Sequence, residues 1–549
     1  MKFKSIFLLP ALLGSLALSL SAASFDVKSY GARGNGKTPD TDAINRAISA
    51  AAAAGGGTVE FPAGEYLSFS IHLQSNVTLY LGPGATIVAA EPPADLAHGY
   101  DAPEPNPGVD QYQDFGHCHW HNSLIWGENL ENIGITGPGK IYGKGLSRGT
   151  PGLRRDLLAG ESRDSVVPGL ALPATAIDQI AAIKPGPFGY PAQDTLPAGV
   201  GNKAIALKNC RNVILRDITI LHGGHFAVLA TGVDNGVFDH VTIDTNRDGI
   251  DLDCCRNVRV TNCSVNSPHD DGICPKSSFA LGYPRMTENI TISDCLVTGY
   301  VEGSLLDGRC IPYPTEPSGR TAIGHIKMGT ESNGGFRNIV IANCIVEYSH
   351  GLALQAVDGA VIEDIAISNI TMRHIYDSPI FIRLGRRLRG PSGTAIGAIR
   401  RVKIDNIVVS DASSGVGGGI LIAGSPGHPI EDVALTNILV EYQGGGTQKD
   451  AARIPPEDER FGYPDPTRFG VLPVWGLMAR HVKNFSATGI EFRLQSADAR
   501  PAVWLEDAAG VELTRFNFPI VPEASQLVRK DVTGLRILQS AGFGLEGQK

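Results

Sequence analysis

One short phrase recurs along most of the chain and restricts the folds open to it. The phrase is an asparagine, then alternating β-branched residues, then a closing Asn or Asp. Clear copies lie at residues 212–217, 257–262, 289–294 and 338–343, and weaker copies start near 401, 431 and 483. A single turn of such strands cannot bury both of its sides, whereas stacked turns can, and the asparagines can hydrogen-bond along the stack. The repeat predicts an all-β chain that forms a right-handed parallel β-helix. A β-sandwich, the alternative, would not repeat one phrase so often.

The residues ahead of the repeat predict a cap for its exposed end. Asp40 or Thr41 can begin a helix over residues 42–54, which Gly55, Gly56 and Gly57 then end. Alternation of period two follows at residues 58–61 and 77–81. We therefore expect one β-helix domain over residues 24–549, with this N-terminal capping helix. Stretches rich in Pro and Gly at 95–120, 145–200 and 444–465 predict long loops that wall a binding groove.

The N-terminal segment 1–23 is typical of a signal peptide. Lys2 and Lys4 precede an apolar stretch at residues 6–20, and small residues follow at 21–23. The alternative, a membrane anchor, is disfavoured because the apolar stretch is short for a span. We expect an exported protein, periplasmic or extracellular, without membrane insertion, and a monomer.

The formal net charge of −9 and the isoelectric point of about 5.9 argue against a general nucleic-acid-binding protein. The nine cysteines include no Cys-x-x-Cys pair, so a zinc site is not indicated. An odd number leaves at least one cysteine unpaired, and we expect several to be buried within strands.

Carboxylates are concentrated in two consecutive repeats. Asp248 and Asp270 are 22 residues apart, which is about one solenoid turn, and Asp271 follows directly. Adjacent rungs lie about 4.8 Å apart, so three acids would share one small patch. Crowded carboxylates raise at least one pKa, so that one group holds a proton while others stay ionised. Hydrolysis of a glycosidic bond with inversion needs this division. The alternatives are a calcium site and aspartates that only cap turns.

Several motifs resemble glycoside hydrolase family 28, the polygalacturonase family. Residues 25–32, 40–44, 55–59 and 75–79 match phrases of its N-terminal part, and 246–248 and 269–271 match its two acidic motifs. The resemblance implies a pectin-lyase-like β-helix that hydrolyses pectic saccharides without a cofactor. It implies that Asp270 is the general acid and that Asp248 and Asp271 hold the water. It also places Asn246, His269 and Lys276 among the substrate-binding residues.

The chain departs from the family pattern in two motifs. The family's Gly-His-Gly motif has no clean copy, and two alignments offer His325 or Glu302 in place of its histidine. The family's Arg-x-Lys pair, which binds a uronate carboxylate, falls at Ala353 and Gln355. Either the uronate carboxylate is bound instead by Lys276, Lys327 or Arg383, or the substrate carries no acidic group at this position. This loss predicts weak action on polygalacturonan and better turnover on mixed pectic fragments such as rhamnogalacturonan oligosaccharides.

These observations predict a glycoside hydrolase that acts on pectic polysaccharide or oligosaccharide. The long loops favour attack at chain ends, because they can close one end of a groove. One alternative is a polysaccharide lyase on the same fold, which would form an unsaturated product that absorbs near 235 nm. The other is a β-helix that binds carbohydrate without cleaving it, which would release no reducing sugar.

Overall fold

The computed structural model describes residues 23–106, 108–113, 115–148, 196–316, 319, 321–457, 463–520 and 526–543. The expected signal peptide at 1–23 lies almost wholly outside these residues, as does most of the expected loop at 145–200, and both stay predictions. No helix within the described ranges is long and apolar enough to cross a bilayer.

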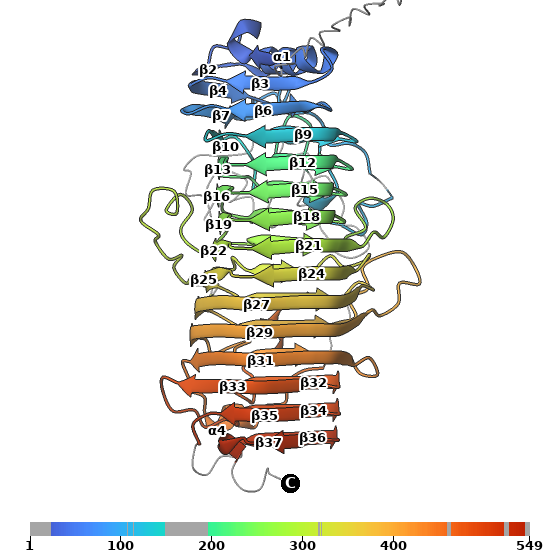
Figure 1. Cartoon of the computed structure of the whole chain (residues 1–549), viewed down its shortest axis with the longest axis vertical. Coiled ribbons are helices and arrows are strands. Elements are labelled where there is room, and N and C mark those ends of the chain that lie inside the picture. The colour runs from blue at the N-terminus through green and yellow to red at the C-terminus, as the bar shows by residue number, and fades with distance from the viewer. Residues whose placement is uncertain are drawn as a thin grey trace, which may run out of the picture.

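Parallel strands are stacked along an elongated molecule, in three stacks over its N-terminal half and in two beyond it (Figure 1). The first stack consists of β5 (Ile71–His72), β8 (Ile125–Glu128), β11 (Lys203–Lys208), β14 (Phe226–Thr231), β17 (Asp248–Asp253), β20 (Ile273–Lys276), β23 (Ile326–Met328), β26 (Leu352–Ala356), β28 (Ile380–Leu384), β30 (Ile420–Ala423), β32 (Leu477–Lys483), β34 (Val503–Ala509) and β36 (Leu527–Thr533). The second stack begins with β1 (Ser24–Asp26), β3 (Gly57–Phe61), β6 (Val77–Leu81), β9 (Glu131–Thr136), β12 (Arg211–Arg216), β15 (Asp234–Asp239), β18 (Arg256–Thr261), β21 (Thr287–Ser293) and β24 (Phe336–Ala342).

The third stack is built from shorter strands and merges with the second in the C-terminal half. Its members are β2 (Asn35–Pro39), β4 (Gly64–Ser68), β7 (Ala85–Ala89), β10 (Lys140–Tyr142), β13 (Thr219–Leu221), β16 (Thr242–Asp244), β19 (Ser264–Asn266), β22 (Leu296–Thr298) and β25 (Ile345–Ser349). Strand β27 (Val361–Ile375) pairs with both β24 and β25, so one long strand replaces two from this rung on. The merged stack continues through β29 (Ala398–Ala412), β31 (Ile430–Tyr442), β33 (Ser486–Leu494), β35 (Glu512–Asn517) and β37 (Arg536–Leu538). The predicted parallel β-helix is confirmed.

The repeated asparagines form a ladder at the start of the second-stack strands. Asn212, Asn235, Asn257 and Asn289 all have left-handed backbone angles, with φ between 56° and 60°. Asparagine tolerates this conformation better than most residues. Each side-chain amide donates to the Asn carbonyl of the preceding rung, over 2.8–3.2 Å. The same residue therefore turns the chain and ties neighbouring rungs together.

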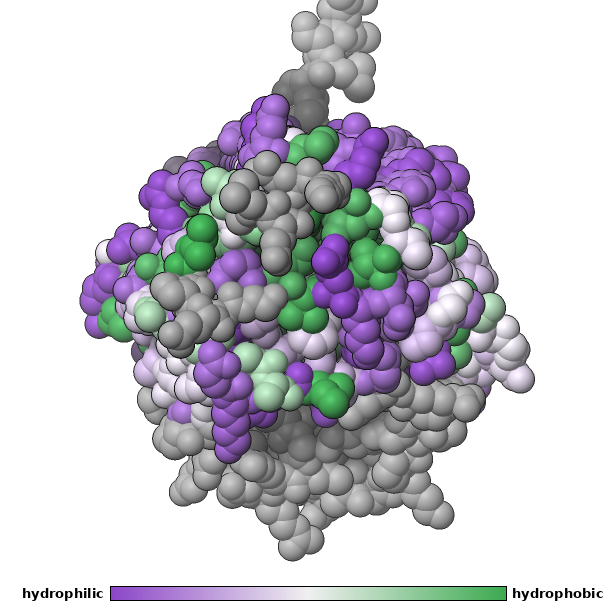
Figure 2. All heavy atoms as spheres, turned by 90° about the horizontal axis from the view of Figure 1, so that it is seen from below, coloured by the Kyte–Doolittle hydropathy of each residue, from purple (hydrophilic) through white to green (hydrophobic). Residues whose placement is uncertain are grey.

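Apolar side chains from all three stacks fill the interior, and the two ends differ. Helix α1 (Thr41–Ala53) covers the first rungs with a buried face that includes Ile44 and Ile48. The carboxylate of Asp40 does not cap this helix but accepts hydrogen bonds from the backbone of Arg33 and Gly34. At the other end the short helix η5 (Ala541–Phe543) packs against β35, and apolar side chains of the described residues are in view there (Figure 2).

None of the nine cysteines, all of which are described, forms a disulfide. Eight are buried, and Cys310 is exposed. Cys255, Cys263, Cys295 and Cys344 belong to the apolar core, as expected for cysteines within or beside strands.

Candidate active site

Two neighbouring rungs of the first stack bring the three predicted catalytic aspartates together. Asp248 begins β17, and Asp270 and Asp271 lie in the turn before β20. The strands pair Ile250 with Ile273, so this turn of the solenoid is slightly longer than the spacing from Asp248 to Asp270. One carboxylate oxygen of each aspartate lies within 4.8 Å of the others.

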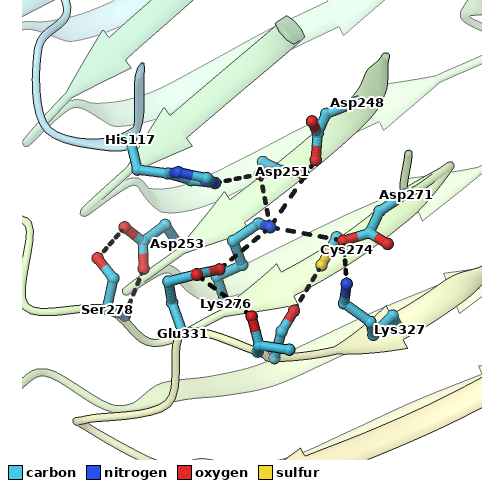
Figure 3. Close-up of polar contacts among 12 residues, drawn as sticks. His117, Asp248, Asp251, Asp253, Asp271, Cys274, Lys276, Ser278, Lys327 and Glu331 are labelled. Carbon is cyan, nitrogen blue, oxygen red and sulfur yellow. Dashed lines mark hydrogen bonds and ion pairs between the residues drawn. The ribbon is translucent and has the colours of Figure 1, made fainter. Parts of the chain in front are cut away.

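The ammonium group of Lys276 lies at the centre of a buried network (Figure 3). Its Nζ is 3.8 Å from Asp248, 3.5 Å from Asp271 and 3.4 Å from both Asp251 and Glu331. Burial lowers the pKa of Lys276, but the carboxylates of Asp251 and its neighbours outweigh burial and raise it well above the ordinary value. Lys276 therefore carries a charge that partly offsets the crowding of the acids.

Asp271 is held in its ionised form. His325 Nε2 lies 2.5 Å from its Oδ1, and Lys327 Nζ lies 2.7 Å from its Oδ2. Burial raises the pKa of Asp271, but the charges of Lys327 and Lys276 and the hydrogen bond with His325 outweigh burial and hold the pKa well below the ordinary value. This carboxylate is therefore available as an anion at neutral pH.

Asp248 has the opposite character. Its pKa is raised well above the ordinary value, first by burial and then by the negative charges of Asp270 and Asp251. Asp270 itself accepts a charge-assisted hydrogen bond of 2.7 Å from Arg247, which stands in the middle of the first acidic motif. The site thus combines a carboxyl group that retains its proton with a neighbouring carboxylate that does not.

The remaining predicted residues occupy different places. His325 and Lys327 both contact Asp271, whereas Glu302 lies elsewhere, 2.6 Å from His222 and in an ion pair with Arg148. Arg383 donates to the carbonyls of Ala423 and Gly424 rather than to the aspartates.

Two further predicted residues lie next to the acidic turns. His269 is buried, with its ring 4.5 Å from that of Tyr313 and its Nε2 3.7 Å from Glu316. Asn246 is buried too, and its backbone carbonyl accepts from the amide of His269.

Among the described residues, two groups of Asp, Cys or His side chains could surround a cation. In the aspartate trio the positive charge is already supplied by Lys276 and Lys327, which a metal ion would have to displace. The other group is Asp110, Cys118 and His119, away from the trio in the loop before β8.

A cavity opens beside the aspartates and encloses about 420 Å³, including its mouth. Asp270, Asp271, His325 and Lys327 form one side, and β26, the turn before β28 and the loop at 463–466 form the rest.

Loops cover the outer side of the first stack on both sides of this cavity. Val109, Cys118 and Trp120 pack over Ala206, Phe226 and Leu229 on β11 and β14. Beyond the cavity, Phe469, Leu472 and Val474 pack over Ala353, Phe381, Leu421 and Met478 on β26 to β32. The acids therefore face a pocket rather than a groove that runs along the stack.

The sequence prediction omitted several residues that the structure adds to the site. They are His117, Asp251, Glu331, His350, Asp377, Tyr463 and Asp465. A signal for Asp251 was present, because Asp251 and Asp253 alternate with Ile250 and Leu252, whose side chains fill the core. The loop residues gave no such signal, since they are distant in sequence from the repeats that carry the acids.

Two family models match parts of the chain. Residues 24–101 match the family described as "Rhamnogalacturonase A/epimerase, pectate lyase-like", and residues 198–311 match "Right handed beta helix region". An exo-poly-alpha-D-galacturonosidase from Dickeya chrysanthemi is 26% identical over 274 residues, which cover 47% of this chain and 42% of that protein. A "Probable polygalacturonase" from Vitis vinifera is 25% identical, covering 65% of this chain and 62% of that protein. The matches thus span less than two thirds of either relative.

The fold is also shared with a solved structure. The family 28 exopolygalacturonase of Yersinia enterocolitica superposes with a TM-score of 0.61 over 91% of this chain and 79% of that one, at 18% identity. This identity is low, so the likeness concerns the fold. The strand stacks and these relatives together identify the chain as a right-handed parallel β-helix protein of the pectin-lyase fold, similar to glycoside hydrolase family 28.

Proposed function

We propose that the chain is a glycoside hydrolase that cleaves pectic oligosaccharides or polysaccharide from a chain end, outside the cytoplasm. The observation that carries the proposal is the aspartate trio, in which burial raises the pKa of Asp248 while Lys327 and His325 hold Asp271 ionised. Glycoside hydrolysis needs one carboxyl that gives a proton and one carboxylate that activates water. The names of the relatives support a pectic substrate.

The three carboxyl groups would divide the reaction between them. Asp248 and Asp270 act as a coupled pair that delivers the proton to the leaving oxygen, because Asp248 retains a proton and Asp270 borders the cavity. Asp271 orients the attacking water. This division differs from the one that the family resemblance implies, which groups Asp248 with Asp271.

We propose that cleavage inverts the anomeric carbon. Both oxygens of Asp271 are already engaged, Oδ1 by a hydrogen bond with His325 and Oδ2 by an ion pair with Lys327, which disfavours covalent attack by this carboxylate. Proton NMR at early times would show a product of inverted anomeric configuration. Retained configuration would mean that a carboxylate attacks the sugar. This is the course of the reaction in retaining enzymes, whose two carboxyl groups lie about 5 Å apart.

Cleavage at the ends of the substrate chain is expected because loops cover the first stack on both sides of the cavity. A polymer can be cut internally only if it runs through an open groove, and the loops pack over the first stack on both sides of the cavity. A terminal sugar can enter such a pocket without passing through it. The expected products are short sugars released from the first minutes, with a slow fall in polymer viscosity.

The electrostatics disfavour a lyase. A lyase needs a neutral Lys or Arg as base, yet Lys276 and Lys327 keep their protons, because nearby carboxylates raise both pKa values against the effect of burial. The test is digestion of a panel of pectic oligosaccharides, followed by reducing-end release and absorbance near 235 nm. Reducing ends without absorbance support hydrolysis, while rising absorbance or no cleavage of any substrate would refute it.

A further inference from the structure

The wall of the cavity that faces the aspartates is built mainly from hydrogen-bond acceptors. Gln355 lies on β26, and Asp377 lies in the turn between β27 and β28. Both side chains are buried, and both line the cavity together with Asp465. The position that pairs with Lys327 on the next rung is Ala353, which offers no polar group at all.

Several of these acceptors accept no hydrogen bond of good geometry from the described residues. Gln355 donates its amide to the carbonyl of Pro464 over 2.8 Å, which leaves Oε1 unpaired. Neither carboxylate oxygen of Asp377 accepts a hydrogen bond of good geometry, although His350 lies 3.0 Å away as an ion-pair partner.

His325 adds an acceptor from the side of the acids. Its Nε2 contacts Asp271, which can only accept when ionised, so Nε2 carries the hydrogen. In the neutral ring Nδ1 is then an acceptor, and Nδ1 also has no partner in the described part of the chain. Buried acceptors left without donors are costly, so a ligand that fills this cavity must supply donors.

The cations of the region are already engaged by the protein. Lys327 lies 2.7 Å from Asp271 and 3.2 Å from the hydroxyl of Tyr463. His350 is 3.0 Å from Asp377. A uronate carboxylate has no donors when ionised, and in this cavity it would meet the like charges of Asp377 and Asp465.

We propose that this cavity binds a neutral, hydroxyl-rich sugar, with Gln355, Asp377 and His325 as the residues that determine this specificity. Hydroxyl groups supply the donors that the wall lacks, and they carry no charge to be repelled. The inference rests on the proposed hydrolase function, because the cavity adjoins the aspartates that would cleave the bond. The natural substrate would then be a pectic saccharide that contains a neutral sugar beside the cleaved bond.

The test compares two purified oligosaccharides, trigalacturonate and a tetrasaccharide in which galacturonate alternates with rhamnose. We expect kcat/KM of the unaltered enzyme to be at least 10-fold higher on the alternating substrate. Asp377→Asn keeps the shape of the side chain but replaces an acceptor by a donor. It should lower kcat/KM on the alternating substrate roughly 10-fold or more, and that on trigalacturonate less than 3-fold. Asp405→Asn, on the second-stack side of β29, is the matched control and should change neither.

Gln355→Met is a second variant, which removes an acceptor without adding charge. Titration calorimetry with free galactose and galacturonate measures binding affinity independently of turnover. Galactose should bind more tightly than galacturonate. Higher kcat/KM on trigalacturonate, tighter galacturonate binding, or an equal loss on both substrates in the Asp377 variant would overturn the inference while leaving hydrolysis established. Cleavage of neither substrate, with no reducing ends from other pectic saccharides, would instead refute the proposed hydrolase.

Discussion

Replacing Lys327 should move the pH dependence of the reaction, because this side chain sets the ionisation of Asp271. The variant Lys327→Met removes a charge that lies 2.7 Å from the Asp271 carboxylate, where both side chains are almost fully buried. With an effective dielectric constant of about 20, a pair at this distance interacts by about 6 kcal/mol. Lys276 and His325 remain, so we expect a smaller change, within the 1–3 pKa units that one neighbouring charge usually produces, or about 1.4–4 kcal/mol.

The direction of the change follows from the role of Asp271. In the unaltered protein the Asp271 pKa lies below its ordinary value, and the carboxylate is functional above that pKa. Loss of the lysine raises the pKa of Asp271. As the pH falls, the variant therefore loses activity at a higher pH than the unaltered protein does. The acidic limb of kcat/KM should move upward by about 1–3 pH units, while the rate well above neutral changes little.

The assay is kcat/KM for reducing-end release between pH 3 and pH 9. Lys327→Arg retains the charge and serves as the matched control, which should keep the acidic limb near its original position. An equal loss of kcat/KM at every pH in Lys327→Met would contradict the reasoning. It would show that Lys327 contacts the substrate directly rather than acting through Asp271.

Three further predictions concern stability and chemical reactivity. Arg500→Met should destabilise the fold by about 3–5 kcal/mol, seen as a lower thermal midpoint. The change leaves the buried Asp498 carboxylate without its charged partner and the carbonyls of Leu472 and Ser414 without the guanidinium donor, so an unchanged midpoint would contradict this reasoning. Asn235→Ala should lower the free energy of unfolding by about 1–2 kcal/mol, seen as a lower urea midpoint, because two ladder bonds are lost and alanine disfavours the left-handed backbone. Asn235→Gly, which accepts that backbone, should cost less, and equal losses in the two variants would mean that the backbone conformation contributes little. A thiol reagent should label only Cys310 in the folded protein and all nine cysteines after unfolding, so labelling of a second thiol without denaturant would show that the core opens.

The sequence predicted the strand stacks and the aspartate trio for the same reason. A solenoid converts a fixed spacing along the chain into proximity, so acids about one turn apart meet, as Asp248 and Asp271 do through the pairing of Ile250 with Ile273. The exact length of this turn was not evident, because the closing loop around Pro268 lies outside the strand pattern and lengthens the turn slightly.

The walls of the cavity could not be predicted in this way. Tyr463 and Asp465 come from a loop that lies far beyond the aspartates in the sequence. Likewise His117, which contacts Asp251 rather than lining the cavity, comes from a loop that precedes the aspartates. Such contacts depend on how the inserted loops pack against the stacks, and the repeat pattern does not predict this packing. Glu302 is an example: the backbone amides of Gly303, Leu305 and Leu306 bind Asp244, and this fixes the insertion so that Glu302 meets His222 rather than Asp271.

The central claim, that the aspartate trio hydrolyses a pectic glycosidic bond, is tested most directly by removing each acid in turn. Asp248→Asn, Asp270→Asn and Asp271→Asn should each lower kcat for reducing-end release on the best substrate by roughly 10²-fold or more, with thermal midpoints that still show a folded protein. Asp217→Asn, an exposed aspartate on the second-stack side paired with His240, is the matched control and should retain full activity. If the three site variants turned over at nearly the unaltered rate while remaining folded, the catalytic group would lie elsewhere and the account would be contradicted.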